Sequence, residues 1–330
     1  SARYPSREME IQSARPGWAE QDPGVWTKNL ERAMELLSKK AGKECAETAA
    51  IGISYQMHGL VAVDQKGNPL RNAIIWCDSR AVEIGDQAFE ELGGEYCLGH
   101  LLNSPGNFTA SKLKWVKEHE PGIYKEIHKI MLPGDYIAYA LTGDIRTTAS
   151  GLSEGIFWDF DRNGVADELL NYYGLRADLL PDLVDTFAIQ VHLKPDVARR
   201  LALPAGIPVT YRAGDQPNNA FSLNVLHPGE VAATAGTSGV VYGVTDQKNQ
   251  DPQSRVNTFL HVNNSDEMRR LGVLLCLNAT GILNAWARHE LLGEQLSYDE
   301  MNALAASAPA GAEGLLVMPF GNGAERMLGN

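Results

Sequence analysis

Two short segments in the second half of the chain carry groups that could transfer a phosphoryl group. Residues 214–216 (Gly-Asp-Gln) place the carboxylate of Asp215 directly after the apolar run 207–213, which is typical of a strand. Residues 235–239 (Ala-Gly-Thr-Ser-Gly) form a turn of small residues between two further apolar runs. A carboxylate can accept the proton of an alcohol, and the N–H groups and hydroxyls of such a turn can bind phosphate. Together the two segments predict phosphoryl transfer to a hydroxyl group.

Each of these segments also has an ordinary structural interpretation. Asp215 could instead cap the short helix expected after it, because Asp is a preferred N-cap residue. The small-residue turn could be a plain hairpin, and its spacing does not match the GxxxxGK[ST] pattern of a P-loop. A base in phosphoryl transfer depends on its position more than on a shifted pKa. The residues alone therefore leave both interpretations of Asp215 open.

Three segments of the first half combine apolar and polar groups, as a sugar site requires. Residues 56–59 (Gln-Met-His-Gly) follow a strand-like run, and Met57 and His58 could form a wall of the site or could be core residues. Residues 76–80 (Trp-Cys-Asp-Ser-Arg) could shape a sugar pocket, or could be a surface Asp–Arg pair near a partly buried Trp. Residues 107–115 open a helix, in which Lys112 is either a surface lysine or holds a loop beside the pocket.

The composition excludes several classes of function. The chain has 330 residues, a net charge of −12 and a pI of about 5.2, which argue against a nucleic-acid or membrane partner. No apolar run reaches the length of a membrane helix, and the first residues do not form a signal peptide. The four cysteines are scattered without a CxxC pair, so we expect no zinc site and no disulfide framework. A reducing, cytoplasmic location is the simplest expectation.

Periodic apolar residues predict an alternation of helices and strands, and hence an α/β protein. Helices are expected over residues 26–40, 81–92, 111–119, 135–141, 218–223 and 281–292. Strands are expected over residues 50–54, 60–63, 73–77, 207–213, 231–235, 240–244, 271–278 and 313–319, with a loose connection over 180–197. The Leu-Pro-Ala-Gly-Ile-Pro run at 203–208 breaks any helix, and it predicts a boundary between domains 1–206 and 207–330.

An ordered set of motifs resembles the FGGY carbohydrate kinases, over almost the whole chain. The matching segments are residues 54–59, 75–80, 108–115, 132–136, 214–216 and 236–239. The resemblance implies two actin-like (ribonuclease H-like) domains, one binding sugar and one binding nucleotide, with a cleft between them. It also implies transfer of the γ-phosphoryl group of ATP, with Mg²⁺, to a ketopentose. The Met-His pair resembles the xylulokinase branch of the family, so D-xylulose is the expected sugar.

The roles of individual residues follow from the same resemblance. Asp215 matches the family's catalytic base, and Met57 and His58 match its sugar-contacting pair. Gln216 follows the base where a sugar contact is common, and Asn107 falls where glycerol kinases carry a sugar-contacting Tyr. The expected nucleotide contacts are Gly236, Thr237 and Gly281. The resemblance assigns no metal ligand within this sequence.

Two family segments are missing from this sequence, namely the Asp-x-Gly-Thr loop that holds phosphate and metal and the Gly-Gly segment that contacts adenine. We therefore expect a piece of a longer kinase, with both domains incomplete, that is impaired on its own and could form a homodimer. Two alternatives stay open, namely another sugar or polyol kinase of the family and a non-catalytic sugar-binding module. An actin-like structural protein would not explain the Met-His and Trp-x-Asp-x-Arg clusters.

Overall fold

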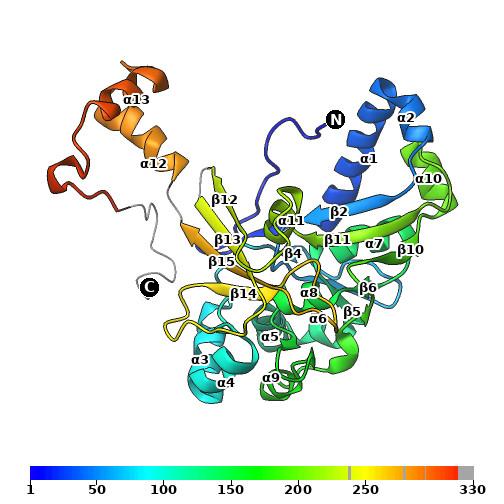
Figure 1. Cartoon of the computed structure of the whole chain (residues 1–330). Coiled ribbons are helices and arrows are strands. Elements are labelled where there is room, and N and C mark those ends of the chain that lie inside the picture. Colours follow the sequence, from blue (N-terminus) through cyan, green and yellow to red (C-terminus); the bar gives the residue numbers. More distant parts are fainter. Residues whose placement is uncertain (237–238, 278–279, 294, 319–330) are drawn as a thin grey trace.

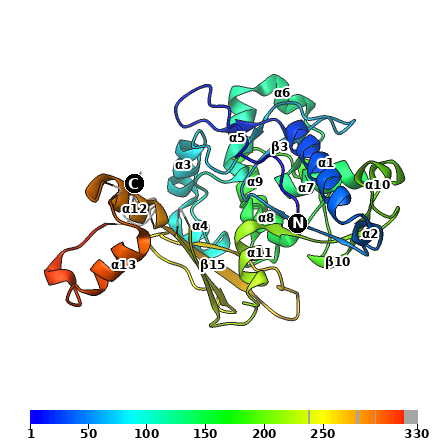
Figure 2. The ribbon, with the colours of Figure 1, turned by 90° about the horizontal axis from the view of Figure 1, so that it is seen from above.

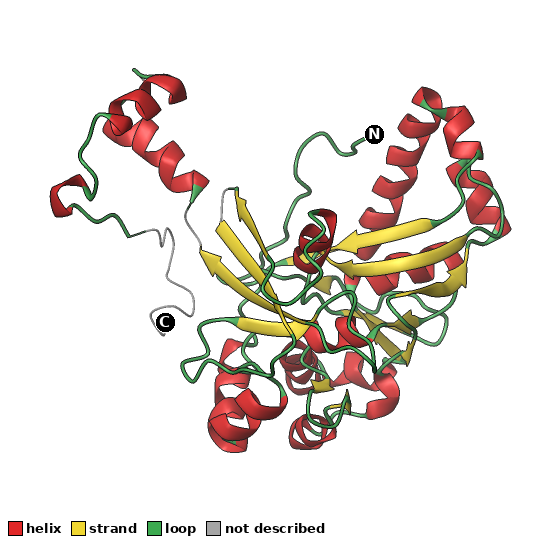
Figure 3. Ribbon diagram, viewed as in Figure 1, coloured by secondary structure: helices red, strands yellow, loops and turns green. Residues whose placement is uncertain are grey.

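The computed structural model describes residues 1–236, 239–277, 280–293 and 295–318, in which helices and strands alternate as predicted for an α/β protein (Figures 1 and 3). The helices are α1 (Pro23–Lys40), α2 (Gly42–Ala46), α3 (Val82–Leu92), α4 (Gly94–His100), α5 (Thr109–His119), α6 (Pro121–Glu126), α7 (Pro133–Thr142), α8 (Ala149–Glu154), α9 (Asp167–Tyr173), α10 (Pro195–Leu201), α11 (Asp215–Ser222), α12 (Gly281–Trp286) and α13 (Tyr298–Ala306).

The strands form two sheets of three and four strands and several short pairs. They are β1 (Glu20–Gln21), β2 (Ile51–Tyr55), β3 (Val61–Val63), β4 (Ala73–Ile74), β5 (Lys129–Met131), β6 (Arg146–Thr147), β7 (Trp158–Asp159), β8 (Gly164–Val165), β9 (Asp182–Leu183), β10 (Phe187–His192), β11 (Pro208–Gly214), β12 (Val231–Ala235), β13 (Gly239–Thr245), β14 (Asn257–Leu260) and β15 (Leu271–Leu277).

The three-stranded sheet has the order β10-β11-β2, with β11 antiparallel to β10 and parallel to β2. The four-stranded sheet has the order β12-β13-β15-β14 and is antiparallel throughout. Helix α11 lies between the two sheets in Figure 1, and α12 and α13 lie apart from the body of the molecule in Figures 1 and 2. Because β11 pairs with β2, the first strand after the predicted boundary continues the sheet of the first half. The division at 206/207 stays a prediction, and this pairing favours a later position, after α11.

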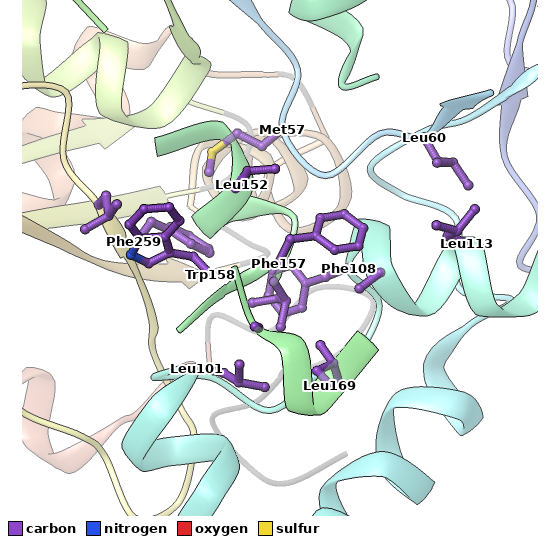
Figure 4. Packing of buried hydrophobic residues seen from close by; sticks show 14 of the residues in the cluster. Met57, Leu60, Leu101, Phe108, Leu113, Leu152, Phe157, Trp158, Leu169 and Phe259 are labelled. Atoms are coloured by element: carbon purple, nitrogen blue, oxygen red, sulfur yellow. The ribbon is translucent and has the colours of Figure 1, made fainter. Parts of the chain in front are cut away.

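The largest hydrophobic cluster joins the two halves of the chain (Figure 4). Phe259 of β14 packs in the same cluster as Leu152 of α8 and Phe157. Polar side chains also hold β14, because the Asn103 side chain accepts from the Thr258 N–H at 3.0 Å and donates to its carbonyl at 2.7 Å. These contacts seat β14, and with it the four-stranded sheet, on the helices of the first half.

Most of the predicted elements are confirmed, with boundaries that shift by a few residues. Helix α1 begins three residues earlier than its apolar spacing suggests, because Asp22 caps it by accepting from the Gly24 N–H at 2.8 Å. The expected strand over 73–77 shortens to Ala73–Ile74. The expected helix over 218–223 begins at Asp215.

Two expectations about the regular structure are wrong. The connection over 180–197 contains strand β10 and the start of α10 rather than a loose loop. Strand β10 pairs with β11 through backbone groups, with an irregular register between Phe187 and Val191. Its apolar residues Phe187, Ile189 and Val191 do alternate along the chain, but the first two stay exposed. The expected strand over 313–319 is not formed in its described part. Residues 312–314 form one helical turn, and residues 315–318 are exposed and pair with no described strand.

Candidate active site

The parallel pairing of β11 with β2 brings the predicted sugar-contacting loop and the predicted base to one edge of the sheet. Gly214, the last residue of β11, is the register partner of Tyr55, the last residue of β2. Asp215 follows the first of these strands, and Gln56, Met57 and His58 follow the second. Ligands bind at the carboxyl ends of parallel strands in open α/β sheets, so this edge is the natural place for a site.

Asp215 is the first residue of α11 and is only partly exposed. Gly214 occupies the N-cap position, and no side-chain hydrogen bond caps this helix. Burial raises the pKa of the Asp215 carboxyl, and hydrogen bonds from backbone N–H groups of residues 215 and 216 partly offset the rise. Gln216, the predicted sugar contact, is also partly exposed beside it. Position and exposure are those that a base acting on a bound alcohol requires.

His58 is held in one orientation from several sides. Its Nδ1–H donates to the carbonyl of Glu154 at 2.8 Å, because a carbonyl oxygen can only accept. The ring packs edge-on against the ring of Phe108, with 4.8 Å between the ring centroids, and is tilted against the ring of Phe259, with 5.4 Å between the centroids. The backbone of His58 has a φ of 59°, in the left-handed region that non-glycine residues rarely adopt. Backbone strain of this kind is often found at functional sites.

Lys112 holds the loop that carries His58. Its ammonium group is buried and donates to the carbonyls of His58 at 2.9 Å and Ile75 at 3.0 Å. Burial lowers the pKa of Lys112 to about 7, although the nearby Asp78 opposes the shift. Of the two interpretations of Lys112, the loop-holding one is confirmed and the surface one is wrong.

Two further predicted sugar contacts lie close to this loop. Met57 is 4% exposed and belongs to the hydrophobic cluster of Figure 4, so the structure shows it as a packed residue behind the edge of the sheet. Asn107 precedes Phe108, whose ring contacts His58. The Oδ1 atom of Asn107 is buried and accepts no hydrogen bond from any described residue. The sugar contacts of both residues stay predictions.

The surface-pair interpretation of segment 76–80 is wrong. Asp78 and Arg80 form a buried ion pair of 2.7 Å, and Trp76 is 59% exposed rather than partly buried. The Arg80 guanidinium lies over the rings of Trp18, with 3.8 Å to the ring centroid, and Trp115, with 4.8 Å. This charged pair therefore braces the packing between distant segments, and the role of Trp76 in a sugar pocket stays a prediction.

The two glycines predicted to contact nucleotide meet in the structure. The N–H of Gly281, at the start of α12, donates to the carbonyl of Gly236 at 2.8 Å, and the Thr280 hydroxyl donates to the same carbonyl at 2.9 Å. Thr237, the third predicted contact, lies outside the described residues. The turn after β12 and the start of α12 thus form one backbone corner.

Sequence reasoning missed Glu154, the last residue of α8. Its backbone binds His58, as described above, and its buried side chain, like that of Met57, lies beside Gly214 at the end of β11. One signal was available, because Glu154 is the single charged residue in the run 147–158. Glu is rarely buried, so composition alone gave no reason to place it in the core.

Neither a metal cage nor a membrane span is found in the described residues. No group of three or more His, Cys, Asp or Glu side chains in residues 1–236, 239–277, 280–293 and 295–318 is placed to hold a metal ion. Across the same ranges, every helix is too short or too polar to cross a bilayer.

Comparisons with known proteins find similar sequences and similar folds. A family model, the N-terminal domain of the FGGY family of carbohydrate kinases, matches residues 2–222. The xylulose kinase of Bacillus subtilis (strain 168) is 30% identical over 325 residues, which are 97% of this chain and 62% of that protein. The crystal structure of xylulose kinase from Rhodospirillum rubrum matches with a TM-score of 0.86 and 27% identity, over 96% of this chain and 64% of that one.

A third match shows the same fold in a kinase named for a sugar acid. Gluconate kinase from Lactobacillus acidophilus matches with a TM-score of 0.87 and 22% identity, over 96% of this chain and 63% of that one. These matches confirm the predicted actin-like (ribonuclease H-like) fold class. The chain spans under two thirds of the length of each of these relatives.

Proposed function

The chain belongs to the FGGY family of carbohydrate kinases, and on this premise we propose that the protein transfers the γ-phosphoryl group of ATP to D-xylulose. The observation that carries the proposal is the pairing of β11 with β2, which brings Asp215 and the loop of Met57 and His58 to one edge of the sheet. Xylulose kinases match nearly the whole chain, which favours a ketopentose as the acceptor.

Asp215 is the proposed base of the reaction. A hydroxyl oxygen of the sugar attacks the γ-phosphorus, and the bond from that phosphorus to the bridging oxygen of ADP breaks. The proton of the hydroxyl passes to the Asp215 carboxylate, and the products are D-xylulose 5-phosphate and ADP. Burial raises the pKa of Asp215, which makes its ionised form a better proton acceptor.

The sugar is proposed to bind between the two strand ends. The ring of His58, oriented by its bond to Glu154, would contact a sugar hydroxyl. The Oδ1 of Asn107, which has no hydrogen-bond partner among the described residues, and the side-chain amide of Gln216 would supply further polar contacts, with Met57 as the apolar wall. A mixture of apolar wall and a few polar groups is typical of small-molecule sites.

The nucleotide is proposed to bind at the corner formed by Gly236 and Gly281, with Thr237 contributing from its turn. Their shared hydrogen bond fixes the backbone where N–H groups could meet phosphate. A magnesium ion in phosphoryl transfer is held mainly by phosphate oxygens and water with one or two carboxylates. When bound, Mg²⁺ would neutralise charge on the transferring phosphoryl group.

The test is ADP formation by the chain with ATP, Mg²⁺ and a panel of D-xylulose, D-ribulose, D-gluconate, glycerol and L-rhamnulose. Sugar binding is measured in parallel by calorimetry. The proposal expects D-xylulose to give the highest kcat/KM and measurable binding. Binding of D-xylulose without any ADP formation would fit the predicted impairment of this piece on its own as well as the non-catalytic sugar-binding alternative, and a preference for another acceptor would reassign the substrate. The homodimer is tested by sedimentation of the same sample.

A further inference from the structure

Residue 154 connects the two strand ends of the candidate site. It closes helix α8, and its carbonyl accepts the Nδ1–H of His58 at 2.8 Å. Through this bond the end of α8 sets the direction of the imidazole ring. The backbone of Glu154 therefore acts on one side of the site, the loop after β2.

The side chain of Glu154 acts on the other side, at the end of β11. Gly214 has no β-carbon, and one placed there would lie 2.5 Å from Glu154 Oε2 and 2.5 Å from Met57 Cγ. The carboxyl group and the Met57 side chain thus fill the space left by the bare Cα of the residue before Asp215. Glu154 is 1% exposed, and its Oε1 atom is buried without a hydrogen-bond partner in the part of the chain that the structure describes.

We propose that Glu154 is a positioning residue of the candidate active site, whose carboxyl group fixes Met57 and the end of β11 relative to one another and thereby sets the place of Asp215. The proposal rests on the proposed function in one respect, namely that Asp215 is the base. A buried carboxyl with an unpartnered oxygen lowers the free energy of unfolding. Because Glu154 lies between the two predicted functional segments, we attribute this destabilising group to a role in the site.

The surroundings of Glu154 favour its uncharged form. Burial raises its pKa well above the usual 4.5, and the carboxylates of Asp135 and Asp215 raise it further. The His58 backbone N–H and the Tyr55 hydroxyl favour the charged form less strongly. The titratable and charged groups that face it are Tyr55 of β2, His58 of the loop, Asp135 of α7 with its partner Arg212 of β11, Asp215 of α11 and Tyr242 of β13.

Two neighbouring carboxyl groups then have separate tasks. Asp215 is the more exposed and loses its proton first, while Glu154 keeps its proton and remains a neutral spacer. Environments that push the pKa values of two carboxyls apart are how one site holds a base beside an acid. Ionisation of Glu154 at higher pH would place a second negative charge beside Asp215 and the incoming phosphates, so turnover should fall there.

Three variants of the full chain test this role by kinetics. Glu154→Gln keeps the shape without an ionisable group, and its kcat near neutral pH should stay within about threefold of wild type, with the alkaline fall of the wild-type profile removed. Glu154→Ala removes the spacer, and its kcat should fall about tenfold to a hundredfold with an unchanged KM for ATP. Glu90→Gln, on the exposed face of α3, is the matched control and should change neither quantity.

A measurement that needs no catalysis tests the same carboxyl. Because the folded chain keeps a proton that the unfolded chain loses above pH 4.5, wild-type stability should fall as pH rises from 4.5 to the folded pKa. Over that window the unfolding constant of wild type should rise about tenfold per pH unit relative to Glu154→Gln. This comparison also decides the case in which Glu154→Ala does not fold.

The outcomes separate this proposal from the proposed function. If the stability of wild type and that of Glu154→Gln changed with pH in parallel, the claim that the folded chain keeps Glu154 protonated would be wrong. A kcat for Glu154→Ala equal to wild type, or a Glu154→Gln variant as impaired as Glu154→Ala, would overturn its positioning role. If wild type forms no ADP with any sugar while the stability difference is present, the proposed function fails and the placement of Glu154 is supported.

Discussion

Gly214 and Tyr55 end two parallel strands in register with one another, and the residues that follow them are the ones with chemistry to perform. Asp215 continues from the first strand, and Met57 and His58 continue from the second. The two segments are far apart in the sequence, and this pairing makes them neighbours. Backbone hydrogen bonds between β11 and β2 thus bring the two parts of the site together, and the side chains of Met57 and Glu154 pack beside Gly214 at the same strand end.

Lys112 should matter for sugar binding although it lies behind the site. In Lys112→Met the carbonyls of His58 and Ile75 lose their donor, which costs about 1–3 kcal/mol for buried unsatisfied groups. We expect D-xylulose to bind about tenfold more weakly, since 1.4 kcal/mol is a factor of ten. Calorimetry measures this, with Lys114→Met on the same helix as the control. Equal affinities for the two variants would contradict the loop-holding role.

Gly214 should tolerate no side chain. In Gly214→Ala the new methyl group meets Glu154 Oε2 and Met57 Cγ at 2.5 Å, and overpacking of this kind costs about 1–3 kcal/mol. Urea unfolding measures the loss, and kcat should fall with it because the methyl group pushes on the residue before Asp215. Gly122→Ala in α6, where a β-carbon meets nothing within 4 Å, is the control and should not destabilise the chain, because Ala has the higher helix propensity. A stable, fully active Gly214→Ala would contradict the packing described.

Arg212 should be needed for the stability of the sheet that carries the site. It is buried on β11, and its guanidinium pairs with Asp135 of α7 at 3.1 Å and donates to Gln190 of β10 at 2.8 Å. Arg212→Met leaves the Asp135 carboxylate unpaired, which costs about 3–5 kcal/mol. The double variant with Asp135→Asn should recover part of this loss. Chemical unfolding of wild type and these two variants checks it, and an Arg212→Met variant as stable as wild type would refute the structural role.

Much of the architecture could be predicted from local signals. The apolar spacing of α1 and the apolar runs of β2, β11 and β12 mark these elements in the sequence. Strand β10 was not predicted although Phe187, Ile189 and Val191 alternate along it. Phe187 and Ile189 stay exposed, so backbone pairing with β11, rather than burial of one apolar face, holds this strand. Residues 315–318 were predicted as part of a strand because they are apolar. They are exposed, and no described strand pairs with them.

The residues of the candidate site were likewise predicted only in part from the sequence. Asp215 and His58 are recognisable because their residue types suit the chemistry and each follows a strand. Glu154 and Phe259 reach His58 only through the packing of α8 and β14, which no local pattern encodes. The burial of the Asp78–Arg80 pair was likewise hidden, because the aromatic rings that enclose it come from residues 18 and 115.

The most direct test of the central claim is Asp215→Asn, with kcat for ADP formation and the affinity for D-xylulose measured on the same sample. Loss of a general base predicts a fall in kcat of about a hundredfold to ten-thousandfold, with sugar affinity and folding close to wild type and Asp86→Asn, on the exposed side of α3, unaffected. The apparent pKa of the acid limb in the wild-type profile of kcat against pH should be higher than the usual Asp value of 3.8, because burial raises the pKa of Asp215. An Asp215→Asn variant that keeps most of its kcat would contradict the account.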